Sequence, residues 1–208
     1  MAKLDWFVPG NRYYEYGLDR GVFYDTRQPG VIWPGLVSVE ESYDVEVDRG
    51  YLDGVAFGAF RSVGAASVTI TSLGRPTGFE TQEGLRRPVS FLTLTQQPRA
   101  AFGLSYRTLV GNDLDALTAG YKIHLWYNLT INPEARTYAT TTETDAAPEL
   151  TFTARAIADP VAGREARAHL TVPSSEPNIS LLEDVLYGTD TDDPRLPPAR
   201  EVYEILGW

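Results

Sequence analysis

The chain has 208 residues, of which 43% are hydrophobic and 22% are charged, so it can bury a core of domain size and is not a disordered segment. It has no cysteine and two histidines, His124 and His169, which excludes disulfides and leaves little material for zinc sites or histidine-dependent catalysis. The formal net charge of -10 has the wrong sign for a protein that holds nucleic acid by neutralising phosphates.

The N-terminal region is rich in aromatic residues. Up to residue 24 they are Trp6, Phe7, Tyr13, Tyr14, Tyr16, Phe23 and Tyr24. Such a segment is costly to leave in water, yet it lacks the period of a central strand. Two interpretations stand side by side: an arm over residues 1–24 that docks on another chain, or an edge strand that folds back on its own core. No segment has the apolar run of a signal peptide or a spanning helix, so we expect neither export nor membrane insertion.

Strand-like alternation dominates the rest of the chain. Short runs rich in Val, Ile, Thr or aromatic residues predict strands at 31–33, 35–41, 66–73 and 150–157. Longer alternation predicts strands at 102–110 and 121–131. Pro and Gly mark turns between them, including Arg87-Pro88. In 121–131 the odd positions are apolar and predict a core face, whereas the even positions, with His124 and Trp126, predict a face toward solvent or a partner.

Residues 43–65 have many Gly and Asp residues and no clear apolar period, so we interpret them as a long loop. Within the sequence S-Y-D-V-E-V-D, an extended backbone places Asp44, Glu46 and Asp48 on one face. We call these three residues the acidic triplet. A solvated strand face is the simplest interpretation of this charge pattern.

Helical pattern is confined to the C-terminal part. Residues 179–187 predict a short helix with an apolar stripe, and Gly188 ends it. Pro197-Pro198 then opens one or two turns through Val202 and Leu206. No linker divides the chain, which predicts one mainly β domain over 1–208, with two packed sheets and a flanking helix.

The sequence contains none of the common catalytic motifs. There is no nucleophile elbow, phosphate-binding lysine loop, zinc-protease motif or dinucleotide fingerprint. His124 has no nucleophile paired with it in the sequence, so we interpret it as a solvated or interface histidine, and His169 offers even less. The acidic turn at 190–193 lacks the glycine and glutamate of a calcium loop. We therefore expect neither an enzyme nor a bound cofactor or metal.

Three segments in combination resemble the major tail protein, or tail tube protein, of long-tailed non-contractile bacteriophages that infect Gram-positive bacteria. They are QPRAAFGLSYRTLVGND at 97–113, GYKIHLWYN at 120–128 with ARTY at 135–138, and LEDVLYGTD at 182–190 leading to RLP at 195–197. A weaker similarity covers GLDRGV at 17–22 and GVIWPGL at 30–36. The chain departs from the family pattern around 58–83, where SVTITSLGRP replaces a more acidic strand and turn.

The resemblance implies a β-sandwich-like subunit that forms six-membered rings, and the rings stack into the tail tube of a virion assembled in the bacterial cytoplasm. The implied partners are other copies of the chain, the tape measure protein in the lumen, and the terminator and distal tail proteins at the tube ends. Double-stranded DNA passes through without specific binding. In this family a long loop and the chain termini reach adjacent subunits.

Two expectations follow for particular residues. Carboxylates in a bore repel the DNA backbone over roughly a Debye length, about 8 Å at physiological ionic strength. The acidic triplet is therefore a candidate for the lumen wall. The aromatic arm and the 43–65 loop are expected to make contacts between subunits and rings, with Trp6, Phe7, Tyr13 and Phe57 as candidates.

Two other classes stay open from the sequence. One is a β-sandwich that binds a ligand or carbohydrate through an exposed aromatic residue such as Trp126. The other is a different virion part, such as a tail terminator or a head-tail connector.

Overall fold

The structure, a computed structural model, describes residues 7–52, 55–114, 119–133, 149–157 and 168–207. At residues 44–52 and 56–65 it describes the backbone alone. The fold is mainly β, with antiparallel sheets and two α-helices, which confirms the predicted fold class. No helix in the described part of the chain is both long enough and apolar enough to cross a membrane.

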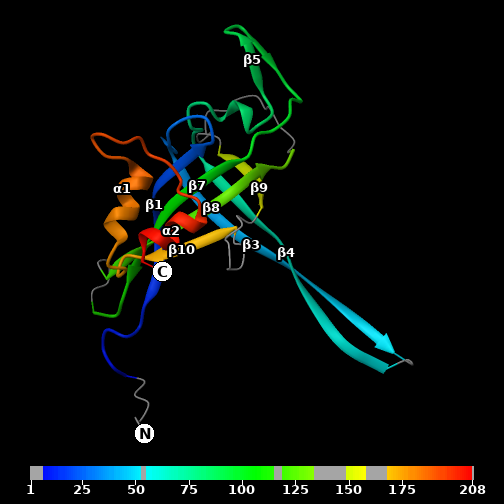
Figure 1. The fold of residues 1–208 in the computed structure, drawn as a ribbon, viewed down its shortest axis with the longest axis vertical. Helices are drawn as coiled ribbons and strands as arrows, with labels where there is room; N and C mark the ends of the chain where they lie inside the picture. Colours follow the sequence, from blue (N-terminus) through cyan, green and yellow to red (C-terminus); the bar gives the residue numbers. More distant parts are fainter. Residues whose placement is uncertain (1–6, 53–54, 115–118, 134–148, 158–167, 208) are drawn as a thin grey trace, which may run out of the picture.

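The strands form one large sheet and one small one (Figure 1). The large sheet has the strand order β2-β1-β7-β8-β9-β4-β3, and β10 also pairs with β8. Its strands are β1 (Tyr14–Asp25), β2 (Val31–Ile32), β3 (Leu36–Leu52), β4 (Val55–Ser72), β7 (Phe102–Gly111), β8 (Gly120–Ile131), β9 (Leu150–Ala156) and β10 (His169–Pro173). The small sheet is the hairpin of β5 (Arg86–Val89) and β6 (Leu92–Leu94).

The large sheet divides into two layers along β8. Residues Lys122 to Trp126 of β8 pair with β10, and residues Leu129 to Ile131 pair with β9. Between these stretches Asn128 has a φ of 50°, a left-handed conformation that interrupts the regular alternation of faces. One layer therefore contains β1, β7, β8 and β10, and β9, β4 and β3 continue into the second.

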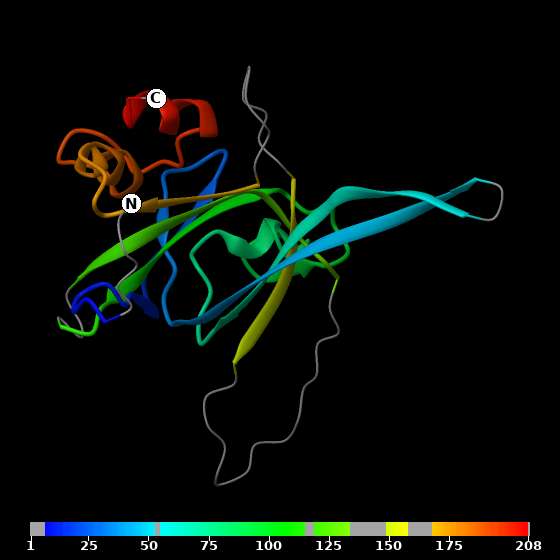
Figure 2. The ribbon, with the colours of Figure 1, turned by 90° about the horizontal axis from the view of Figure 1, so that it is seen from below.

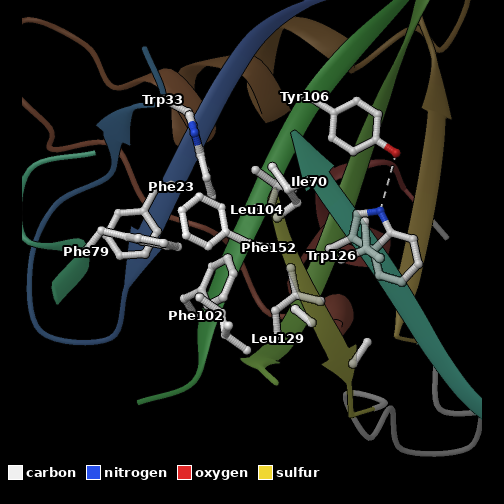
Figure 3. Packing of buried hydrophobic residues seen from close by; sticks show 14 of the residues in the cluster. Phe23, Trp33, Ile70, Phe79, Phe102, Leu104, Tyr106, Trp126, Leu129 and Phe152 are labelled. Carbon is white, nitrogen blue, oxygen red and sulfur yellow. Dashed lines mark hydrogen bonds between the residues drawn. The ribbon is translucent and has the colours of Figure 1, made fainter. Parts of the chain in front are cut away.

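The main core fills the space between the layers. Phe23, Phe102, Leu104 and Trp126 come from the first layer, and Ile70 and Phe152 come from the second (Figure 3). Phe79, in the 3-10 turn Phe79–Thr81 (η1), is fully buried and packs edge-on against several of these rings. Burying these large rings offsets the entropy of ordering the strands that carry them.

The two helices cover the other face of the first layer (Figure 2). Helix α1 (Ile179–Tyr187) buries Leu182 and Leu186, and helix α2 (Ala199–Ile205) buries Ala199 and Val202, against Ile123, Leu125 and Tyr127 of β8. Both predicted helices and the stop at Gly188 are confirmed. Tyr24 fixes α1 to the sheet, since its hydroxyl donates to the carbonyl of Leu186 at 2.9 Å.

The prediction for the two faces of 121–131 is wrong in one respect. Trp126 is fully buried and His124 is nearly so, because the second layer covers the face that alternation assigned to solvent. Both faces of β8 are thus occupied at its centre, which a single strand's pattern does not reveal. Three strands were also missed: β10, which holds His169, β6, and β5, which holds the Arg87-Pro88 predicted to be a turn.

The aromatic N-terminal region divides between the two interpretations. From Tyr14 onward it is strand β1, paired with β7 and β2, with Phe23 and Tyr24 buried. Residues 7–13 precede the strand and leave Phe7 and Tyr13 largely exposed. From Tyr14 onward the region thus folds back on the sheet of its own chain, as the second interpretation predicts, and docking of the preceding residues on another chain stays a prediction.

Candidate functional site

The most conspicuous surface feature is a two-stranded ribbon that extends away from the body (Figures 1 and 2). It comprises residues 44–52 of β3 and 55–65 of β4, which we call the projecting hairpin. Its pairing runs from Val45 opposite Val63 to Leu52 opposite Val55. The paired residues 45–52 of β3, at about 3.3 Å each, give a reach of roughly 25 Å. The segment 43–65, predicted to be a long loop, is thus a β-paired hairpin, and its role in stacking stays a prediction.

An irregularity in pairing marks the base of this hairpin. The register shifts between Tyr43 and Val45, so that β4 carries an extra residue there. Strand β9 pairs with β4 only from Ala66 to Ser72, so it ends at the same level. Beyond this point β3 and β4 have each other as their sheet neighbours among the described residues.

The structure places the candidate assembly residues as follows. The acidic triplet lies on the β3 arm of the projecting hairpin and Phe57 lies on its β4 arm, but their side chains lie outside the described residues. Trp6 also lies outside them. Phe7 is 78% exposed and Tyr13 is 65% exposed. Neither the lumen assignment nor the contact assignment is tested by these positions, and both stay predictions.

A second cluster, which the sequence did not indicate, lies in the body beside the base of the hairpin. It joins Glu41 of β3 to His124 of β8 and His169 of β10, and we call it the His-Glu cluster. The sheet register explains its assembly: His169 pairs with Trp126 and Thr171 with His124, so the two histidines are diagonal neighbours on adjacent strands. Glu41 comes from the second layer, where β3 crosses this face.

The cluster is held by short polar contacts. His124 Nδ1 lies 3.1 Å from His169 Nε2, and 3.5 Å from Glu41 Oε1. On its other side, His124 Nε2 lies 3.2 Å from Glu15 Oε1. The Tyr43 hydroxyl lies 2.7 Å from His169 Nδ1, and the Tyr106 hydroxyl donates to Glu41. Every nitrogen of the two rings thus has a polar partner, as buried polar groups require.

Aromatic rings enclose the two imidazoles. His124 stacks on Tyr106 with centroids 4.7 Å apart, and His169 stacks on Trp126 with centroids 4.4 Å apart. The histidine rings themselves lie at 14° with centroids 5.3 Å apart, although two of their nitrogens are separated by 3.1 Å. Two nearly parallel rings with such a short N···N contact meet edge to edge, so one nitrogen donates its proton to the other.

The protonation states follow from burial and these partners. Burial raises the pKa of the Glu41 carboxyl, but hydrogen bonding with His124 and Tyr106 outweighs it and lowers that pKa to about 2. Burial also lowers the pKa of His169 to about 4, and the attraction of Glu41 offsets only part of this effect. At neutral pH Glu41 is therefore a carboxylate and His169 is a neutral imidazole.

The cluster borders an open pocket of about 640 Å³ between the layers. Its walls come from β1, β3, β7, β8 and β10, and they include Glu15, Lys122 and Thr108 beside the three cluster residues. Burial raises the pKa of Glu15, but hydrogen bonds from Lys122 and Thr108 lower it more, so Glu15 is also ionised. The pocket therefore presents two carboxylates and two imidazoles close together, a set that can bind a cation or relay a proton.

Sequence reasoning missed this site because its parts are distant along the chain. The available signal was that His169 and Thr171 alternate with Leu170 and Val172, as His124 alternates with Ile123 and Leu125. Alternation places each histidine on a polar strand face. It does not indicate that the two strands pair, or that β3 supplies a carboxylate above them.

No family model and no curated protein matches the chain.

Proposed function

We propose that this protein is a structural subunit that polymerises, as stacked six-membered rings, into the tail tube of a long-tailed bacteriophage. The observation that carries the proposal is the projecting hairpin. An isolated two-stranded ribbon has little stability of its own in water, and its outer edges offer unpaired backbone groups to any passing strand. Binding of the ribbon to a neighbouring subunit would stabilise it and pair its free backbone groups.

The topology of the body agrees with a repeating contact. A ribbon on one side of the body that docks on a different surface of the next copy makes a heterologous contact, and such contacts close into rings when the rotation per subunit allows it. The edge strand β3 has β4 as its one sheet neighbour among the described residues. Pairing of sheet edges between copies would continue the sheet around the ring.

Exposed apolar residues outside the core provide further contact area. Phe7 and Tyr13 precede β1, and Phe91, which is 89% exposed, lies at the turn of the β5–β6 hairpin with Leu92 and Val89 beside it. In Figure 1 the β5–β6 hairpin and the N-terminal segment extend in different directions from the body. Apolar groups on separate projections suit contacts with several neighbouring subunits rather than with one ligand.

The composition suits a channel for a polyanion. A net charge of -10 disfavours adhesion of DNA, and an acidic wall repels phosphates within a Debye length. We assign part of this charge, including the acidic triplet, to the lumen. In this proposal the tape measure protein fills the lumen before the genome passes, and the protein acts as a conduit and not as an enzyme.

The carbohydrate-binding alternative loses its main support. It depended on Trp126 as an exposed aromatic platform, and that side chain is fully buried between the layers. Its indole Nε1 also donates to the Tyr106 hydroxyl at 3.4 Å inside the core (Figure 3). A sugar cannot stack on this ring without separating the two layers.

Electron microscopy of the purified chain, with and without the projecting hairpin, tests the proposal. Val45 and Val63 face each other across the ribbon, so an Asn-Gly turn can replace the residues between them and leave the body intact. We expect the wild type to form rings or tubes of uniform diameter, and the shortened variant to remain a folded monomer. A wild type that stays monomeric at high concentration would overturn the proposal.

A further inference from the structure

We propose that the His-Glu cluster is a binding site for a divalent transition metal ion such as Zn²⁺, with His124, His169 and Glu41 as its ligands. This site is additional to the tube function and does not depend on it. The three ligand atoms, one from each residue, lie within 4.8 Å of one another.

The separations agree with coordination distances. Zn–N and Zn–O bonds in proteins are about 2.0–2.2 Å long, so two ligand atoms around one ion lie roughly 3–3.5 Å apart. The His124 Nδ1 to His169 Nε2 distance of 3.1 Å and the His124 Nδ1 to Glu41 Oε1 distance of 3.5 Å both fall in this range. A small rotation of the two rings directs both lone pairs toward the carboxylate, and the ion then replaces the proton that the rings share.

The surroundings of the ligands also match a metal site. Histidine ligands of metals usually donate their second N–H to a carboxylate or another oxygen, which fixes the ring orientation. Here Glu15 Oε1 lies 3.2 Å from the second nitrogen of His124, and the Tyr43 hydroxyl lies 2.7 Å from the second nitrogen of His169. The third ligand is supported in the same way, since Tyr106 donates to Glu41.

The donor set indicates the class of metal. Two imidazoles and one carboxylate suit Zn²⁺ and its neighbours in the first transition row, whereas Ca²⁺ and Mg²⁺ prefer oxygen ligands. Three protein ligands leave a coordination position toward the open pocket, which a water molecule can occupy. Bound metal would connect β3 to β8 and β10, which fixes the base of the projecting hairpin to the body.

The composition of the chain makes this proposal easy to test. The chain has no cysteine, and both of its histidines lie in the cluster, so binding of Zn²⁺ through imidazole can occur nowhere else in the chain. Untagged protein, freed of metal with a chelator, is titrated with ZnCl₂ by calorimetry. We expect one ion per chain, a loss of at least roughly 100-fold in affinity for His169→Gln and Glu41→Gln, and about 10- to 100-fold for Glu15→Gln.

Glu40→Gln is the matched control, because Glu40 is the adjacent carboxylate on β3 and its side chain is exposed outside the cluster. Its affinity should equal that of the wild type. Where a cluster variant fails to fold, NMR of the wild type provides the test. The resonances of the imidazole nitrogens of both histidines should shift at one equivalent of Zn²⁺. Absence of stoichiometric binding, or binding that leaves both imidazoles unchanged, would overturn the proposal.

Discussion

Replacing Phe79 with alanine is the most direct test of the two-layer core. Phe79 is fully buried in η1, and its ring lies 5.2 Å from that of Phe23, 5.0 Å from Trp33, 5.5 Å from Phe102 and 5.2 Å from Phe152. These rings come from both layers, so Phe79 closes one end of the space between them (Figure 3).

The expected cost of Phe79→Ala is about 4 kcal/mol. Truncating a buried phenylalanine typically costs 3–5 kcal/mol, and the edge-on ring pairs place this position within that range rather than below it. For a chain of this size, about 4 kcal/mol corresponds to a fall of roughly 8–16 °C in Tm. Equilibrium unfolding in urea, followed by tryptophan fluorescence, measures the loss directly because Trp33 contacts the substituted ring.

The matched control is Phe91→Ala, the same substitution at a ring that is 89% exposed on the β5–β6 hairpin. It should change the free energy of unfolding of the monomer by less than about 0.5 kcal/mol. A cost below about 1 kcal/mol for Phe79→Ala, or equal costs for the two variants, would refute the packing described between the layers.

Three further changes test the acidic triplet, the N-terminal residues and one ion pair. Replacing the acidic triplet with Asn, Gln and Asn should leave assembled tubes intact but make them retain DNA at low salt, which co-sedimentation measures. Variant tubes that bind as little DNA as the wild type would count against a lumen position. Deleting residues 1–10 should impair polymerisation and leave the circular dichroism of the domain unchanged; normal tubes would exclude a role for the arm. Asp19→Asn should cost about 1 kcal/mol at pH 7, because Arg107 makes two hydrogen bonds to that carboxylate and lowers its pKa. Because the pKa of Asp19 is lower in the folded chain than in the unfolded chain, its ion pair stabilises the fold at any pH above the unfolded pKa of about 4. The difference in stability between Asp19→Asn and the wild type should therefore fade as the pH falls below about 4. A difference that does not change with pH would contradict this explanation.

Local patterns in the sequence were sufficient to place several elements along the chain. The alternation at 102–110 and 121–131 and the apolar stripe at 179–187 predicted β7, β8 and α1 to within a residue or two. The same patterns did not predict burial where both faces of a strand are covered: Trp126 occupies an even position in β8, yet the second layer buries it. Alternation describes a strand, whereas burial depends on what other strands place above it.

The projecting hairpin and the His-Glu cluster escaped prediction for related reasons. Glycine and aspartate are depleted in strands, so the composition of residues 43–65 predicts a loop, although backbone pairing between β3 and β4 holds them extended. His124 and His169 are separated by 45 positions and meet only because β10 pairs with β8. Contacts of this kind arise from strand order, which composition and periodicity do not specify.

Electron micrographs of end-on assemblies decide whether this chain is a tube-forming subunit, because they show the symmetry of its rings. Purified protein is concentrated, imaged by electron microscopy and averaged in end-on views. We predict rings with six-fold symmetry and an open centre, which stack into tubes of one diameter and are lost when the projecting hairpin is shortened. A monodisperse monomer, or assemblies that persist unchanged without that hairpin, would contradict the proposed function.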